Sequence, residues 1–410
     1  MLRRPAVLKL LFIALLAETG YAVMNLSTMQ PYLRDDRHFG TGTIGLVIVA
    51  YLLSEALFKS PMGHISDRIG PKKLMLIGPS ISVFTALISL IVPRTGGSFM
   101  EVLTFVGLRS LDGLGAAMIW PAAYTAVSNA VEDCERQEVM SFLNLCYMVG
   151  IAIAFGFGGA ANDLTHTKWA GMILAAAMFL GVAISVWRFV PEIDPSEVKH
   201  DRPEETGFSD FKQSLKQIPT YLLLSLVTFA GIGFPFAIFK FFLADQFQLS
   251  ESMIGAFILP SALAMAGASV PMSKFGERIG RANAVHLGLL LSSGGMWLIA
   301  LGAFFPPLRH DWICAIGGIP LAIGFLLTIP AWMASVSDIN PQRRGANLGA
   351  VMTAQGLGAI IGAPIGSFMY EKLQHVGLGH SFGRYSPFLG CAACITVGFI
   401  LSLHILRDPK

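Results

Sequence analysis

Stretches of about 20 apolar residues recur along this chain from one end to the other. As an α-helix, such a stretch is long enough to cross the roughly 30 Å hydrocarbon core of a bilayer. Only 13% of the residues are charged, whereas soluble domains carry about 25%. Strands are not expected, because an open sheet edge leaves backbone groups without partners in lipid. The sequence therefore predicts an all-α membrane protein.

We expect twelve transmembrane helices. Their approximate bounds are 7–33, 43–64, 73–93, 100–128, 138–161, 168–190, 218–244, 252–274, 282–305, 311–336, 345–371 and 385–406. The first segment begins like a signal peptide. Its apolar character continues to Leu33, however, which indicates a retained helix.

One region divides the chain into two halves. Residues 191–217 are dense in charge and proline, a composition typical of a solvated linker. We therefore predict an N-terminal six-helix bundle at 1–190, a cytoplasmic linker at 191–217 and a C-terminal six-helix bundle at 218–410.

The basic residues predict the orientation in the membrane. Most Lys and Arg side chains lie near the termini and in the connections that follow even-numbered segments. The positive-inside rule places these connections, and both termini, in the cytoplasm. The expected location is the cell inner (plasma) membrane, with the chain as a multi-pass monomer in the lipid bilayer.

Several function classes lack their sequence motifs. There is no basic patch with interleaved aromatic residues, which excludes nucleic acid as an expected partner. There is no phosphate-binding loop, no nucleophile elbow and no set of residues with metal-ligand spacing. Cys391-x-x-Cys394 lies inside the last apolar segment, where small packing residues are a better interpretation than a metal or redox site. We expect no enzyme activity, cofactor or metal.

A short polar island at 63–73 separates the second and third segments. It reads Gly-x-x-x-Asp-Arg-x-Gly-x-Lys-Lys, and its glycines permit a tight turn between antiparallel helices. Residues 272–280 repeat the pattern in the second half, with Glu277 and Arg278 in place of the Asp-Arg pair. Two further pairs of segments are similar in sequence: 119–122 matches 328–331, and 150–159 matches 358–366. These matches indicate an internal duplication.

The island resembles the loop 2–3 signature of the major facilitator superfamily, and the resemblance covers nearly the whole chain. It implies two six-helix bundles related by a pseudo-two-fold axis along the membrane normal. It also implies an inner gate, in which the acidic residue of the island docks on the eleventh helix and Glu277 plays the mirror role on the fifth. The alternative is a set of ordinary turn residues with topology-setting charges. The gating residues are Gly63, Asp67, Arg68, Gly70, Lys72, Lys73, Glu277 and Arg278.

Glu18 lies near the middle of the first segment. An ionisable residue at this depth is a functional candidate by default, and a lone carboxyl group is suited to bind and release a proton in each cycle. Tyr21 and Asn25 extend the same polar stripe. The alternative is a structural hydrogen bond to a neighbouring helix.

Arg109 and Asp112 lie three apart in the fourth segment and therefore share a helix face. The family carries an Arg here, within an Arg-x-x-x-Gly-x-Gly pattern that is linked to proton coupling, and the family's layout would allow Arg109 to meet Glu18. A self-satisfied pair that only stabilises the bundle is the alternative. In the second segment, Glu55 and Lys59 have the spacing of an ion pair, which is either mutually neutralised or part of the substrate or proton site.

In this family, helices one, four, seven and ten line the central cavity. The residues that would line it here are Tyr21, Asn25, Trp120, Tyr124, Phe234, Phe236, Phe239, Lys240, Trp332 and Met333. Their apolar character suits a hydrophobic or amphipathic substrate better than a sugar. Lys240 could instead snorkel to the outer interface.

Together these features predict a secondary transporter that works by alternating access and exports a small molecule in exchange for protons.

The fifth segment departs from the family's antiporter motif, because Ala154-Phe155 stand where that motif has Gly-Pro. Tight packing of the two halves still explains the glycines of segments five and eleven. Segments such as 50–56 are also similar to bacterial glycolipid flippases, so a lipid-like substrate is the alternative. A non-transporting scaffold or receptor of the same fold is a further rival.

Overall fold

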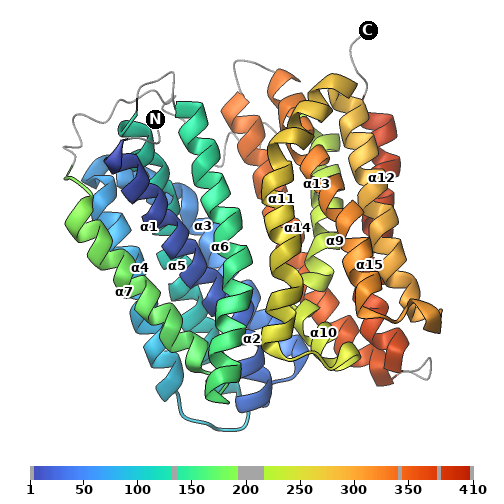
Figure 1. The fold of residues 1–410 in the computed structure, drawn as a ribbon, viewed down its shortest axis with the longest axis horizontal. Coiled ribbons are helices and arrows are strands. Elements are labelled where there is room, and N and C mark those ends of the chain that lie inside the picture. The colour runs from blue at the N-terminus through green and yellow to red at the C-terminus, as the bar shows by residue number, and fades with distance from the viewer. Residues whose placement is uncertain (1–3, 132–135, 193–216, 340–343, 376–379, 407–410) are drawn as a thin grey trace. The chain divides into compact units, whose positions relative to one another are not determined.

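The computed structural model describes residues 4–131, 136–192, 217–339, 344–375 and 380–406, and none of them lies in a strand. The linker predicted at 191–217 lies almost wholly outside these residues. Eleven described segments are long and apolar enough to cross a membrane, and α11 is the remaining long helix. The prediction of an all-α membrane protein with twelve long helices is confirmed (Figure 1).

The chain forms two compact units. The first contains Met1–Asp201 and Leu249–Ala262, and the second contains Arg202–Gln248 and Leu263–Lys410. The helices of the first unit are α1 (Pro5–Ala22), α2 (Met29–Pro31), α3 (Thr41–Ile69), α4 (Pro71–Ile91), α5 (Phe99–Asn129), α6 (Arg136–Thr165) and α7 (Ala170–Phe189). The later helices are α9 (Pro219–Phe236), α10 (Phe239–Phe247), α11 (Glu251–Ile279), α12 (Arg281–Ala300), α13 (Asp311–Ile339), α14 (Arg344–Lys372) and α15 (His380–Ile405).

Within the first unit, α5 packs against both α3 and α4, while α1 packs against α6 and α7. Within the second, α9 packs against α14 and α15, and α12 packs against α13 and α15. The first span continues beyond α1 through wider π-helical turns at Val23–Thr28 and Tyr32–Asp36. Such turns are frequent at functional sites, and the first of them carries Asn25.

The predicted 63–73 loop is mostly helix. α3 continues through Gly63 to Ile69, because polar residues can extend a helix beyond the hydrocarbon into water. The turn is made by Gly70 alone, whose φ of 87° is readily available only to glycine. Gly280 makes the same turn between α11 and α12, with a φ of 89°. The two copies of the duplicated motif therefore share one turn geometry.

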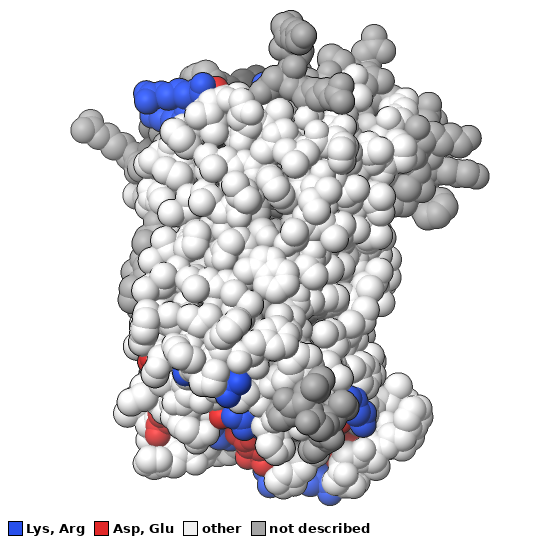
Figure 2. All heavy atoms as spheres, turned by 90° about the vertical axis from the view of Figure 1, so that its right-hand side faces the viewer, with Lys and Arg blue, Asp and Glu red and all other residues white. Residues whose placement is uncertain are grey.

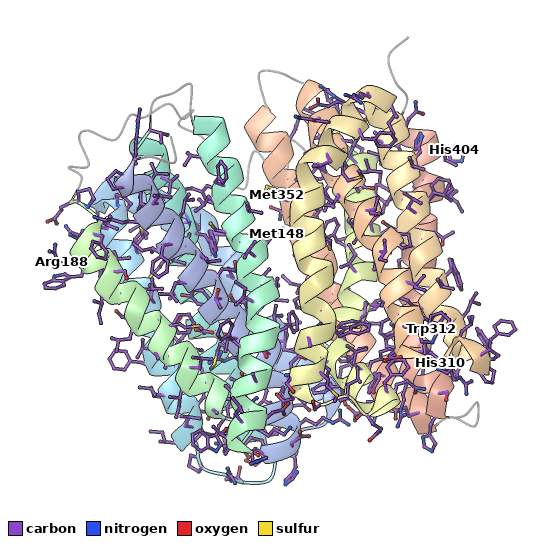
Figure 3. The ribbon with its side chains drawn as sticks, viewed as in Figure 1. Met148, Arg188, His310, Trp312, Met352 and His404 are labelled. Atoms are coloured by element: carbon purple, nitrogen blue, oxygen red, sulfur yellow. The ribbon has the colours of Figure 1, made fainter. Side chains whose placement is uncertain are left out.

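The molecular surface matches a bilayer. Figure 2 shows the face on the side of α12 and α15, where the described charged side chains gather at the two ends and leave an uncharged band between them. At one end of α13, the exposed ring of Trp312 stacks on His310 with centroids 5.9 Å apart (Figure 3). Amphipathic rings are enriched at membrane–water interfaces. Below, the ends of the helices near Gly70 are called the inner end, and the ends near 36–41 the outer end, following the predicted orientation.

Candidate functional site

Glu18 is buried in the middle of the first unit, with 6% of its surface exposed. It is positioned by close packing of α1 against α6. A Cβ atom on Gly150 of α6 would lie only 2.9 Å from the Glu18 Cβ atom, so glycine is what lets the two helices approach here. The charges of Glu55 and Lys59 act on the carboxyl group, and the Trp120 side chain lies close to it.

Glu55 and Lys59 form the ion pair that their spacing predicts, with 2.6 Å between Lys59 Nζ and Glu55 Oε1. The Glu55 side chain is 15% exposed and that of Lys59 is 46% exposed. A charge within a membrane-spanning helix is costly unless it is paired or faces water. The pair meets the first condition.

Aromatic side chains complete this group. The Trp120 ring contacts Tyr147 of α6, with centroids 5.0 Å apart, and Tyr124 of α5, with centroids 6.2 Å apart. Tyr124 is partly exposed, whereas Trp120 is buried. We call Glu18, Glu55, Lys59, Trp120, Tyr124 and Tyr147 the Glu18 cluster. It combines two carboxyl groups, one ammonium group and three amphipathic rings.

Arg109 and Asp112 form a second, separate group. Their ion pair is 2.9 Å long, and the exposed fractions of the two side chains are 1% and 0%. Arg109 also donates to Asn25 Oδ1 and to the Ser89 hydroxyl, both at 3.4 Å. Asp112 accepts from Asn25 Nδ2 and Thr85 Oγ1, both at 3.3 Å. Of the buried side-chain atoms of Arg109, Asp112, Asn25, Thr85 and Ser89, only Arg109 Nε has no hydrogen-bond partner among the described residues.

This Arg109 network joins α4, α5 and the π-helical turn that follows α1. Its hydrogen bonds lead to Asp112, Asn25 and Ser89, so Arg109 does not meet Glu18. Tyr21, one turn along α1 from Glu18, is buried and accepts a hydrogen bond from the Ser82 hydroxyl at 3.1 Å. The geometry supports the structural interpretation of the Arg109–Asp112 pair.

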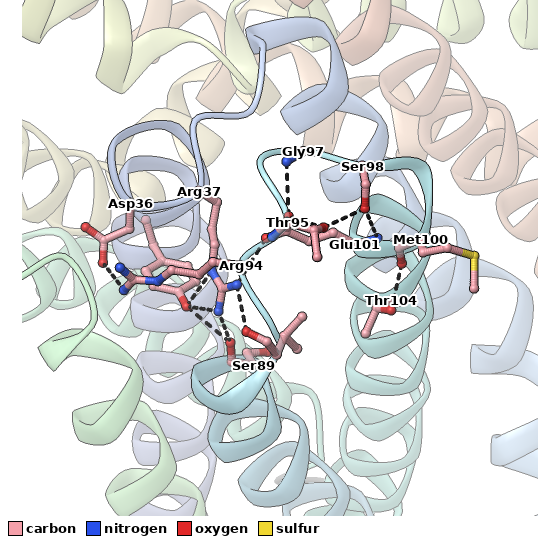
Figure 4. Close-up of polar contacts among 12 residues, drawn as sticks. Asp36, Arg37, Ser89, Arg94, Thr95, Gly97, Ser98, Met100, Glu101 and Thr104 are labelled. Carbon is pink, nitrogen blue, oxygen red and sulfur yellow. Dashed lines mark hydrogen bonds and ion pairs between the residues drawn. The ribbon is translucent and has the colours of Figure 1, made fainter.

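A third polar group, missed from the sequence, lies at the outer end (Figure 4). Arg37 donates to Glu101 Oε1 at 3.0 Å, to the Val92 carbonyl at 2.8 Å and to the Tyr32 hydroxyl. Glu101 Oε2 accepts from the backbone amides of Thr95 and Gly97, both at 3.0 Å. The group ties the 92–98 connection to the end of the first span. Ser98-x-x-Glu101 has the spacing of a helix capping box, a signal that could have found it.

A fourth group lies where α11 begins. Glu251 accepts from Asn162 of α6 at 2.8 Å and from Lys168 at 2.6 Å. Lys168 is also 3.5 Å from Asp35, and the backbone amide of Ser252 donates to Asp163 at 2.8 Å. Sequence reasoning missed this group, because its contacts join residues 162–168 to residues 251–252, which lie more than 80 residues further along the chain.

The predicted cavity residues of the second unit differ in burial. Trp332 is 1% exposed, and the ring of Phe234 lies against Gly390 of α15. Lys240 is buried and engaged by other residues, so the prediction that it snorkels to the interface is wrong. Phe236, by contrast, is exposed. Phe239 and Met333 are half-buried.

The gating motif is only partly described. Lys73, Glu277 and Arg278 are exposed and Lys72 is half-buried. The side chains of Asp67 and Arg68 lie outside the described residues, and so do most of those at 345–349, the start of the eleventh helix on which Asp67 is expected to dock. The docking of Asp67 therefore stays a prediction.

The glycines of α14 pack within one unit. A Cβ on Gly358 would lie 2.5 Å from the backbone oxygen of Leu226 in α9, and Gly362 and Gly366 likewise contact α9. These glycines therefore bring α14 close to a neighbour in its own unit, which corrects the expectation that they pack the two halves together. Small residues have this role in membrane helices generally, because they let backbones approach closely.

The twelve long helices, the uncharged surface band and the charged groups buried between helices define a polytopic membrane protein of the kind that moves solutes. The family model of the Major Facilitator Superfamily matches residues 10–259 and 221–410. The chain belongs to this superfamily.

Relatives and solved structures agree with this assignment. The chain is 26% identical to the MFS-type transporter YceJ of Bacillus subtilis (strain 168) over 375 residues, covering 90% of each chain. It is 23% identical to Multidrug resistance protein 2 of the same organism, covering 98% of this chain and 96% of the relative. The crystal structure of the nucleoside transporter NupG matches with a TM-score of 0.79 at 14% identity, covering 97% of this chain and 99% of that one. The likeness to NupG concerns the fold alone.

Proposed function

We propose that this protein is a secondary active transporter that exports a hydrophobic or amphipathic small molecule in exchange for protons, by alternating access. One observation carries the proposal: Glu18 is a carboxyl group buried in a membrane helix and surrounded by a second carboxyl, an ammonium group and aromatic rings. Buried ionisable residues in membrane spans are typical of proton relays in transporters.

The cluster supports a proton carrier for a physical reason. Glu55 has a counter-ion in Lys59, with 2.6 Å between Lys59 Nζ and Glu55 Oε1, whereas Glu18 has no ion pair among the described residues. Like charges that share a site cannot both ionise freely. We therefore assign proton binding to Glu18, with Glu55 and Lys59 as the charges that act on it.

The remaining assignments follow from geometry. Arg109 and Asp112 affect Glu18 only indirectly. They form hydrogen bonds with Asn25, which lies in the same span as Glu18, and so help to hold that span in place. Tyr124, whose partly exposed ring lies against Trp120, offers aromatic surface to a hydrophobic substrate. Export is supported by the relative named for multidrug resistance, which matches nearly the whole chain. The expected location is the inner membrane, with both termini in the cytoplasm.

Trp120 provides a direct test of proton binding. Because its side chain lies beside Glu18, we expect its fluorescence emission to titrate with pH in purified protein. The titration should be isolated as the difference between the wild type and Trp120→Phe. It should disappear in Glu18→Gln and persist in the matched control Glu192→Gln, which removes an exposed carboxyl group. A titration that survives in Glu18→Gln would remove Glu18 from its proposed role.

Transport is tested in liposomes with ethidium as the hydrophobic probe. A proton gradient should drive ethidium movement, and a protonophore or Glu18→Gln should abolish the gradient-driven component. Ethidium movement that is indifferent to both would overturn proton coupling, and no movement of any member of a wider dye and lipid panel would favour a non-transporting protein.

A further inference from the structure

Two basic side chains meet at the inner end of the first unit, where α1 begins and α7 ends. Lys9 Nζ lies 4.8 Å from the centroid of the Phe189 ring, and Arg188 Cζ lies 5.9 Å from the same centroid. The two cations are therefore no further apart than these two distances added together. α1 and α7 pack against each other within the first unit, so the contact does not involve the second unit. We call Lys9, Arg188 and Phe189 the basic corner.

The basic corner has no counter-charge among the described residues. Neither Lys9 nor Arg188 forms an ion pair with any carboxyl group that the structure describes. Glu192, four residues beyond Arg188, is exposed and pairs with neither of them. By contrast, Arg37 and Arg109 each have a carboxylate partner. Like charges gathered without a counter-ion repel one another, so their proximity indicates an anion that comes from outside the chain.

Exposed apolar side chains surround the basic corner. Trp187, Phe12 and Leu8 are all exposed. Beneath them, Val7 and Val186 are buried, so the exposed side chains form the outer face of a packed contact between α1 and α7. Apolar side chains beside basic ones match the chemistry of a phospholipid, whose charged headgroup is joined to long apolar chains.

The ends of the two spans give the depth of the basic corner. The first apolar span begins at Pro5 and the span of α7 ends at Phe189, so Lys9 and Arg188 both lie near a boundary of the hydrocarbon. Figure 3 shows Arg188 at the inner end of α7. Long basic side chains near helix ends reach toward the headgroups. The predicted orientation places this end in the cytoplasmic leaflet, where anionic lipids attract basic residues.

We propose that the basic corner binds the headgroup of an anionic phospholipid in the leaflet at the inner end. Its phosphate supplies the negative charge that Lys9 and Arg188 lack, and its acyl chains run along Trp187 and Phe12. Hydrogen bonds from Lys and Arg to phosphate are charge-assisted and therefore strong. The inference does not use Glu18 or transport, and it requires only that the first unit lies in a bilayer.

Trp187 reports on the bound lipid, because it precedes Arg188 and is 68% exposed. The protein is placed in phosphatidylcholine vesicles in which a small fraction of the lipid is brominated, since bromine atoms quench a nearby tryptophan. The Trp187 signal is the difference between the wild type and Trp187→Phe. We expect brominated phosphatidylglycerol to quench this signal at least threefold more than brominated phosphatidylcholine at the same fraction. Equal quenching by the two lipids would overturn the proposal.

Variants test whether the two cations carry this preference. Lys9→Met/Arg188→Met should reduce quenching by brominated phosphatidylglycerol to the level of brominated phosphatidylcholine. Lys9→Arg keeps the charge and should keep the preference. Lys73→Met, which removes an exposed cation at the inner end of α4, is the matched control and should keep it as well. A preference that persists in the double variant, or one that Lys73→Met removes equally, would refute the assignment to the basic corner.

Competition identifies the occupant. The preference should fall as sodium chloride is raised, because exposed charges are screened at high ionic strength; a preference indifferent to salt would contradict an electrostatic site. At matched ionic strength, inorganic phosphate and a polyglutamate peptide should not displace the lipid. Displacement by phosphate would assign the corner to the free ion, and displacement by the peptide would assign it to an acidic protein segment. Either result would overturn the lipid as its ligand.

Discussion

The Arg109 network and the Glu18 cluster both bury ionisable side chains in the first unit, but they are built differently. Arg109 and Asp112 are almost fully enclosed and bind each other, Asn25 and neighbouring hydroxyl groups. The Glu18 cluster contains a buried carboxyl group beside an ion pair whose Lys59 side chain is 46% exposed.

The difference separates two uses of charge inside a membrane. A closed, satisfied network fixes the geometry of a bundle, because breaking it leaves a charge without a partner. An open cluster can exchange a proton or a ligand with water. Both groups lie within membrane-spanning helices. They differ in whether each charged side chain is enclosed and fully paired, as in the Arg109 network, or partly exposed, as in the Glu18 cluster.

The largest effect is expected where the closed network is broken. Asp112→Ala leaves the Arg109 guanidinium buried without its counter-ion, which should cost about 3–5 kcal/mol of stability. Thermal unfolding in detergent measures it. The double variant Arg109→Met/Asp112→Leu should recover most of the loss. A stable Asp112→Ala protein that no longer transports would instead place this pair among the working charges.

The Arg37–Glu101 group should behave like the Arg109 network. Glu101→Ala removes the acceptor of Arg37 and of two backbone amides, and we expect a loss of about 3 kcal/mol. Glu101→Gln keeps a hydrogen-bond acceptor and should lose less. Equal melting temperatures for the two variants would show that charge alone matters in this group.

A smaller effect is expected at the contact between α1 and α6. Gly150→Ala places a Cβ 2.9 Å from the Glu18 Cβ atom, and overpacking of this kind costs about 1–3 kcal/mol. Gly156→Ala on the same helix is the matched control, since a Cβ there meets nothing within 4 Å. Both stability and the Trp120 titration should change in the first variant only; the same response in both would mean that the helix, not its contact with Glu18, is sensitive.

The smallest effect on stability is expected for the partly exposed ion pair of Glu55 and Lys59. Lys59→Met keeps the aliphatic length of the side chain and removes a partly exposed ion pair, which is worth about 0–1 kcal/mol. The melting temperature should hardly move, whereas the Trp120 titration should shift because Glu18 loses a nearby positive charge. A loss of stability as large as that of Asp112→Ala would erase the distinction between the two groups.

The sequence predicted some of these groups better than others. The Arg109–Asp112 and Glu55–Lys59 pairs follow from helical spacing and are present. The other contacts of the Arg109 network could not be predicted from the sequence, because Asn25 and Arg109 lie 84 residues apart in the chain. A similar separation in sequence hid the group where α11 begins, whose contacts with residues 162–168 span 83 to 89 residues.

The sequence by itself determined the number and length of the helices, because the thickness of the hydrocarbon core sets how many apolar residues a span needs. It also determined that the duplicated motif would turn at a glycine, although it placed the end of α3 too early. Only the tertiary structure decided which buried charges are closed and which are open. That depends on how each helix is rotated against its neighbours, and contacts between helices far apart in the chain set this rotation.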